Sequence, residues 1–106
     1  MGSINFIEKA KCKLYGLCEH ERAAIRPEKI ELSRTEKETS LRAQIKEIEF
    51  RGFYDRITVC VSHGVQGDMI LLVDVPFRMV KTMQFRIGEV VYVNLPREEL
   101  LGFKTA

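Results

Sequence analysis

Two cysteines and a histidine near the N-terminus, Cys12, Cys18 and His20, are of types that can bind zinc. A structural zinc site needs four ligands, and its cysteines usually stand close together as Cys-x-x-Cys or an equivalent. The spacing here is wide, and the remaining candidates, Cys60 and His63, would have to approach through the fold. Buried or half-buried thiols are the simpler interpretation. We therefore expect no metal and no other cofactor.

Catalysis by His63 or by a pair of carboxylates has little support in the sequence. A catalytic base needs a partner within hydrogen-bond reach, and no serine or cysteine stands in a recognisable nucleophile motif. Asp55 and Asp68 flank a predicted hairpin, where turn chemistry explains both. No Gly-x-x-x-x-Gly-Lys-Ser/Thr phosphate loop occurs either. We therefore expect that the chain neither hydrolyses ATP nor carries catalytic residues.

Aromatic and basic residues are mixed in one short segment, which contains Phe50, Arg51, Phe53, Tyr54 and Arg56. Single-stranded nucleic acid favours such surfaces, because bases stack on rings and phosphates meet arginine. The alternative is a barrel strand with its aromatic residues in the core and an exposed arginine. If this surface binds a ligand, we expect Arg51, Tyr54 and Arg56 to face it. The net charge of +2, with the signs interspersed, argues against a dedicated nucleic-acid-binding protein.

The composition limits the class of protein. A chain of 106 residues with 45% hydrophobic and 30% charged residues is typical of one globular domain, so we expect residues 1–106 to form a single domain. No apolar run approaches the roughly 20 residues of a membrane-spanning helix, and no signal peptide is visible. Three cysteines are an odd number, which fits reduced thiols in the cytosol better than disulfides.

Short strands must position these residues. Alternation of apolar and polar residues predicts strands at 4–14, 23–25, 29–32, 41–50, 54–62, 69–75 and 90–95. Glycines mark turns at Gly52, Gly64 and Gly88. The polar segment 33–40 is predicted to be a solvated loop and the most mobile part of the chain. Residues 77–85 have near-helical spacing, and residues 97–103 are expected to form one helical turn.

The segment 41–50 gives the clearest indication of the fold. Leu41, Ala43 and Ile45 share one face of a strand, and then the phase slips to Ile48 and Phe50. One such slip predicts a β-bulge, a feature that bends strands in barrels. The sequence therefore predicts an all-β fold, a small OB-like β-barrel of about six short strands. The predicted core contains Ile45, Phe50, Ile57, Val59, Val61, Leu72, Val91 and Val93.

Several motifs resemble one known family. Residues 2–7 resemble the segment that follows the nucleotide-binding domain in the ATP-binding subunits of bacterial ABC importers. Arg26-Pro27-Glu28 resembles the Arg-Pro-Glu motif of these subunits, Phe50-Arg51-Gly52 their Phe-x-Gly turn, and residues 87–91 their late Gly-acidic-x-Val. On these motifs the chain is identified as a member of the TOBE (transport-associated OB) domain family. Arg51 departs from the pattern, because an apolar residue is common there.

The resemblance implies an accessory C-terminal domain that supports dimerisation of the ATP-binding subunit or its response to an effector in solute uptake. Its partners would be the importer ATPase domain, the dimer mate and, through the parent subunit, the transmembrane permease. Asn5, Arg26, Pro27 and Glu28 are the expected domain-interface residues. We also expect a homodimer, no nucleic acid, no direct membrane insertion, and a cytoplasmic location peripheral to the inner membrane.

Other functions stay open at this point. One is a small-oxyanion-binding OB module like the molybdate-binding relatives of the TOBE family. Another is an OB domain that binds single-stranded nucleic acid through Arg51, Tyr54 and Arg56. Arg26-Pro27-Glu28 also has a purely structural interpretation, a strand end with a local ion pair.

Overall fold

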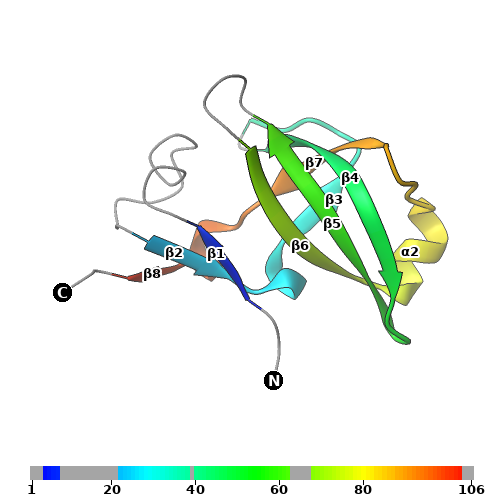
Figure 1. Cartoon of the computed structure of the whole chain (residues 1–106), viewed down its shortest axis with the longest axis horizontal. Helices are drawn as coiled ribbons and strands as arrows, with labels where there is room; N and C mark the ends of the chain where they lie inside the picture. Colours follow the sequence, from blue (N-terminus) through cyan, green and yellow to red (C-terminus); the bar gives the residue numbers. More distant parts are fainter. Residues whose placement is uncertain (1–3, 8–21, 39, 63–67, 104–106) are drawn as a thin grey trace.

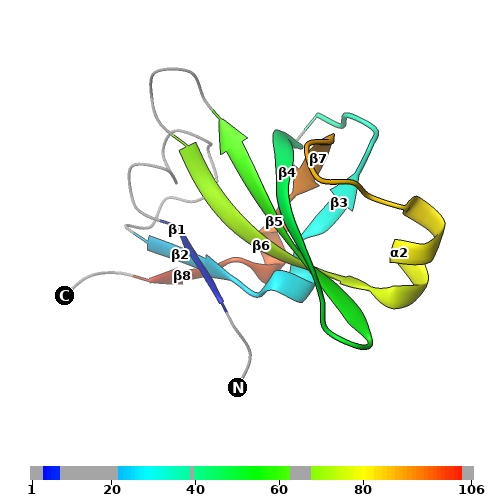
Figure 2. The ribbon, with the colours of Figure 1, turned by 45° about the vertical axis from the view of Figure 1, so that its right-hand side comes forward.

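The computed structural model describes residues 4–7, 22–38, 40–62 and 68–103. Antiparallel strands in two sheets dominate these residues, in an OB-like all-β arrangement (Figure 1). The strands are β1 (Asn5–Ile7), β2 (Arg22–Ile25), β3 (Glu31–Ser33), β4 (Leu41–Phe50), β5 (Tyr54–Ser62), β6 (Asp68–Pro76), β7 (Val90–Asn94) and β8 (Leu101–Phe103). The large sheet has the order β3-β7-β4-β5-β6 and the small sheet the order β1-β2-β8. The large sheet curls into a half-barrel (Figure 2).

The predicted β-bulge is present in β4. Ile45 pairs with Val59 of β5, but Glu47 pairs with Thr58, so Lys46 is the extra residue. The backbone N–H of Ile45 donates to the carbonyl of Glu89 at 2.9 Å, and the carbonyl of Ile45 accepts from Gly88 at 2.7 Å. The first half of β4 also pairs with β7. The bulge thus lies where β4 diverges from β7, and it increases the bend of the sheet.

The core lies inside the curled sheet, where β5, β6 and β7 each bury alternate residues. Most of the predicted core is confirmed: Ile45, Ile57, Val59, Val61, Val91 and Val93 are all buried. Two predictions were wrong. Phe50 is 70% exposed because it stands at the end of β4 beside the hairpin turn. Leu72 lies on the outer face of β6 and is only half-buried, while Leu71 and Val73 face inward.

The two edge strands of the large sheet, β3 and β6, approach each other without a ladder between them, so the sheet stays a half-barrel. A short 3-10 helix, η1 (Pro27–Lys29), packs against β6 on this side. Beside it, the Asn5 side chain of β1 bonds to the backbone of Leu72: Nδ2 donates to the carbonyl and Oδ1 accepts from the N–H, each at 2.8 Å. A side-chain amide thus joins the small sheet to the free edge of the large one.

Of the predicted turns and helical segments, some are confirmed and others differ in the structure. Gly52 and Gly88 occupy turns with φ of 90° and 89°, which only glycine adopts readily, so both predicted turns are confirmed. Gly64 lies outside the described residues, as does most of the predicted strand 4–14. Residues 77–85 contain the helix α2 (Phe77–Met83). Residues 97–103 form a 3-10 turn, η3 (Arg97–Glu99), followed by β8 instead of ending as helix.

Polar residues 34–38 and Ser40 form a loop, as predicted, whereas Ser33 is the last residue of β3 and pairs with Tyr92. Arg34 anchors the start of the loop through an ion pair with Glu89, a hydrogen bond to the carbonyl of Gln84, and a position over the Phe85 ring. Lys37 and Ser40 close a local turn, in which the Lys37 N–H donates to the Ser40 hydroxyl at 2.8 Å. The mobility of this loop stays a prediction. Among the described residues, no helix is long and apolar enough to cross a membrane.

Candidate functional site

Arg26, Pro27 and Glu28 form a rigid corner between the two sheets. Pro27 is buried and begins η1, a position where its missing N–H costs nothing. Arg26 precedes it in extended conformation, and its carbonyl accepts from the Lys29 N–H at 3.0 Å. The side chains of Arg26 and Glu28 are exposed, and neither forms an ion pair with a described residue. The local ion pair of the structural interpretation is therefore not formed, and both charges face outward.

Asn5, the fourth expected interface residue, is buried. Both polar atoms of its side chain are used within the chain by the bonds to Leu72. The described part of the structure thus gives Asn5 a clear structural role. A further role at an interface with another domain stays a prediction.

The mixed aromatic and basic segment occupies the tip and the flanks of the β4–β5 hairpin. Arg56 forms a bidentate ion pair with Asp74, with N–O distances of 2.9 and 3.0 Å, and hydrogen bonding to this carboxylate raises the pKa of Arg56. Arg51 pairs with Glu49 at 3.2 Å in an exposed position, and Tyr54 is half-buried. Both arginines therefore already have carboxylate partners, which weakens their case as ligand-facing residues.

The candidates for metal binding and acid–base chemistry do not come together. Asp55 pairs in register with Val75 and Asp68 with Ser62, so the two aspartates stand at opposite ends of the β5–β6 ladder. Asp55 is buried, and its Oδ1 has no described hydrogen-bond partner. Cys60 is a buried free thiol, whereas Cys12, Cys18, His20 and His63 lie outside the described residues. Within the described ranges, no group of three or more metal-ligating side chains occurs.

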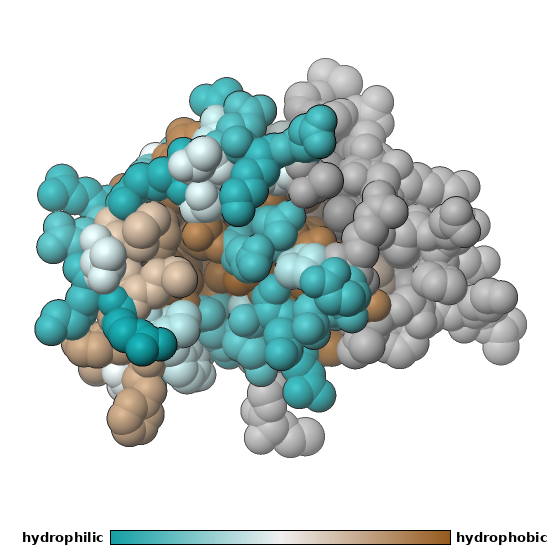
Figure 3. Space-filling model, turned by 180° about the vertical axis from the view of Figure 1, so that it is seen from behind, coloured by the Kyte–Doolittle hydropathy of each residue, from teal (hydrophilic) through white to brown (hydrophobic). Residues whose placement is uncertain are grey.

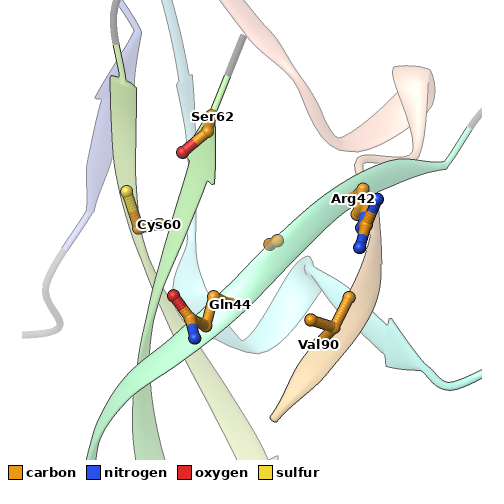
Figure 4. Close-up of a pocket in the computed structure, with 6 residues that line it drawn as sticks. Arg42, Gln44, Cys60, Ser62 and Val90 are labelled. Carbon is orange, nitrogen blue, oxygen red and sulfur yellow. The ribbon is translucent and has the colours of Figure 1, made fainter. Parts of the chain in front are cut away.

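A hollow of about 320 Å³ on the outer face of the large sheet was not predicted from the sequence. It is lined by Arg42, Ala43, Gln44, Cys60, Ser62 and Val90, from β4, β5 and β7 (Figure 4). The Gln44 amide donates to the carbonyl of Gly88 at 3.1 Å and accepts from Lys46 at 3.0 Å. Arg42 forms no ion pair within the described residues. In Figure 4, Val90 of β7 lies on one side of the β4 ribbon, and Cys60 and Ser62 of β5 lie on the other.

A second hollow, of about 410 Å³, lies between β3 and the end of β6; we call it the β3–β6 groove. Its lining consists of Glu28, Ile30, Glu31, Leu32, Ser33, Lys37, Asp74, Val75, Pro76 and Met79. Figure 3, which views the molecule from behind, shows apolar surface in a hollow bordered by hydrophilic side chains. Of these residues, only Glu28 was singled out from the sequence. The others come from residues 30–37 and 74–79, two segments that are far apart in the sequence.

Comparison with known proteins places this fold in a family. The family described as "TOBE domain" matches residues 23–103. No curated protein matches the chain. Among solved structures, one of the cytoplasmic molybdate-binding protein ModG, with molybdate bound, is similar with a TM-score of 0.66 and 14% identity. The similarity covers 79% of this chain and 61% of that one, so the chain spans about three fifths of the ModG chain. The match over residues 23–103 shows that this chain belongs to the TOBE domain family.

Proposed function

We propose that the chain is a non-catalytic accessory domain of the ATP-binding subunit of an ABC importer, where it supports dimerisation of that subunit or its response to an effector. One observation carries the proposal: the Arg26-Pro27-Glu28 corner holds two opposite charges outward on a buried proline. Such a corner suits a fixed contact with a neighbouring domain, since arginine can meet a carboxylate through two hydrogen bonds. The TOBE match covers this corner.

In this function the domain acts only by binding. A domain can bias a transport cycle only if it binds two states of the ATPase dimer with unequal affinity. The corner is stiff, because Pro27 fixes the backbone and the Lys29 and Ile30 N–H groups bond back across η1. A conformational change in the ATPase domain would therefore change the affinity of its contact with Arg26 and Glu28. The domain would work in the cytoplasm, peripheral to the inner membrane through the transporter.

The test is co-purification with importer ATP-binding subunits from the same organism. We expect the wild-type chain to form a complex, and Arg26→Glu and Glu28→Lys each to weaken it. Arg42→Glu is the matched control, because Arg42 is exposed on another face and the variant carries the same charge reversal. Absence of any complex, or equal weakening by all three variants, would count against the proposal. Calorimetry should also detect no binding of ATP to the isolated chain.

A second candidate function is the binding of a small oxyanion. The similar ModG structure contains molybdate, and the outer-face hollow of this chain offers the guanidinium of Arg42 and the hydroxyl of Ser62. Calorimetric titration with sodium molybdate, compared with sodium sulfate, tests this function. Binding that Arg42→Ala abolishes and Arg86→Ala leaves intact would support it. The hollow would be excluded as an oxyanion site if neither anion gave a heat of binding. It would also be excluded if both variants bound the anion as the wild type does.

A further inference from the structure

The floor of the β3–β6 groove is apolar, although it lies at the surface. Ile30 and Leu32 contribute from the β3 side, Val75 from β6, and Met79 from α2. Ile30, Leu32 and Val75 are buried by their neighbours, while Met79 stays 47% exposed at the wall. A volume of about 410 Å³ with this lining accepts one or two aliphatic side chains.

The wall formed by β6 carries open backbone groups. In a strand, the N–H and C=O of one residue point to the same side, and residues two apart point alike. Both backbone groups of Leu72 face away from β5, because both bond to Asn5. The N–H and C=O of Asp74 therefore face the same free edge, inside the groove. No described residue bonds to them.

Asn5 shows what kind of group this edge accepts. Its carboxamide, one donor and one acceptor on adjacent atoms, has the hydrogen-bonding groups of a peptide unit and bonds to Leu72 as a paired strand would. Two residues further along β6, Asp74 offers the same backbone donor and acceptor, but no side-chain amide of a described residue bonds to them. The backbone of an extended peptide could therefore exchange two hydrogen bonds with Asp74, as the Asn5 side chain does with Leu72.

The rim of the groove indicates the charge of the occupant. Glu28 and Glu31 are exposed on the rim, and Lys37 is the one basic residue among the described lining residues. The Asp74 carboxylate is already paired with Arg56. The rim is thus acidic on a chain whose net charge is +2. A second copy of the chain that paired edge to edge through a twofold axis would bring like charges together.

We propose that the β3–β6 groove binds an extended peptide segment of a partner protein, rich in lysine or arginine, as an added strand on β6. The peptide backbone exchanges hydrogen bonds with Asp74. Alternate aliphatic side chains enter the floor against Leu32 and Met79, and the basic side chains between them lie near Glu28 and Glu31. Glu28 is shared with the proposed contact with an ATPase domain. The test below contains no ATPase, so its failure and the failure of that proposed function are distinguishable.

The probe is the acetylated and amidated hexapeptide Lys-Val-Lys-Val-Lys-Val, titrated into the full-length chain and followed by amide NMR. We expect chemical-shift changes centred on Asp74 and Met79, with slower hydrogen exchange at the Asp74 N–H. Two control peptides separate the contribution of backbone hydrogen bonds from that of the basic side chains. One has N-methylated peptide groups, which cannot pair with the strand, and one has glutamate in place of lysine; neither should bind. No detectable binding of the probe at about 1 mM would overturn the proposal.

Protein variants locate the site. Met79→Ser and Glu28→Lys should each weaken binding at least about fivefold, since each removes one contact of the groove. Glu36→Lys is the matched control: Glu36 is exposed outside the lining, and its charge change is the same as that of Glu28→Lys. Equal affinity for all variants would overturn the proposal. A dimer of the free chain that Met79→Ser dissociates would also overturn it, because the occupant would then be a second copy.

Discussion

Asn5 of β1 and Leu72 of β6 exchange two hydrogen bonds of 2.8 Å, so that a side-chain amide takes the place of a strand. β6 is one of the two edge strands of the five-stranded sheet, and an open edge is a place where other chains can pair. Asn5 covers part of that edge and at the same time fastens the small sheet to the large one. Because Asn5 is only 6% exposed, water cannot readily replace either bond.

The first prediction concerns this pair. Asn5→Ala should lower the free energy of unfolding by about 1–3 kcal/mol, because it leaves the backbone groups of Leu72 without partners. Asn5→Asp keeps the shape but replaces the donor to the Leu72 carbonyl with a second acceptor, so it should be at least as destabilising. Urea denaturation measures both, and hydrogen exchange at the Leu72 N–H should accelerate. An unchanged exchange rate in Asn5→Ala would contradict this account of the edge.

Local pattern made part of this fold predictable. The phase slip after Ile45 predicts the bulge because a strand can bring Ile45 and Ile48 to one face only by gaining a residue. Gly52 and Gly88 predict turns because their backbone angles are strained for other residues. The end of the strand before Arg26-Pro27 was also predicted, because proline stops a strand. The 3-10 helix that begins at Pro27 was not predicted. Each of these signals lies within a few residues of its effect.

Contacts between distant segments were not predictable in this way. Asn5 and Leu72 are separated by 67 positions, and no local sequence pattern around either residue indicates that the two are in contact. The burial of β6 was misjudged at Leu72 because the continuous apolar run 69–73 hides which residues face inward. The β3–β6 groove was not predicted for the same reason as the Asn5 contact, because residues far apart in the sequence form it. Its lining comes from η1, β3, β6, α2 and the loop after β3, which only the curled sheet brings together.

The second prediction concerns the core. Val59 is completely buried in β5, so Val59→Ala should cost about 1–3 kcal/mol of unfolding free energy through lost burial and a cavity. Ile70→Ala is the control, because Ile70 is 57% exposed on the outer face of the neighbouring strand, and it should cost less than about 0.5 kcal/mol. Chemical denaturation compares the two. Equal losses would mean that the inward and outward faces of β5 and β6 are assigned wrongly.

The third prediction concerns Glu89, which ties Arg34, at the start of the polar loop after β3, to the turn before β7. A hydrogen bond from Arg34 lowers the pKa of Glu89, and the Arg86 N–H adds to this effect. A carboxyl group whose pKa is lower in the folded state adds stability above its ordinary pKa. That stability disappears as the pH falls through the folded-state pKa.

Urea midpoints measured from about pH 6 to about pH 3 test this dependence. The midpoint of Glu89→Gln should fall less steeply with acid than that of the wild type, because the variant has no carboxylate to protonate. Glu36→Gln serves as the control, since Glu36 is exposed and forms no ion pair with a described residue; its curve should follow the wild type. A Glu89→Gln curve parallel to the wild type would show that the Arg34 bond contributes nothing in solution.

The last prediction is that the chain forms a homodimer at high concentration through the tip of the β4–β5 hairpin. Phe50 and Phe53 are 70% and 93% exposed there, and the N–H of Phe77 donates to the carbonyl of Phe53 at 2.9 Å, which places the start of α2 beside them. Exposed apolar surface of this kind drives association when no partner covers it. Sedimentation across a concentration series should show a monomer–dimer equilibrium that Phe53→Ser shifts to monomer. Met79→Ser should leave it unchanged, because Met79 lines the groove instead of the tip. A single monomeric species at every concentration would exclude the dimer, and dissociation by Met79→Ser would move the interface to the groove.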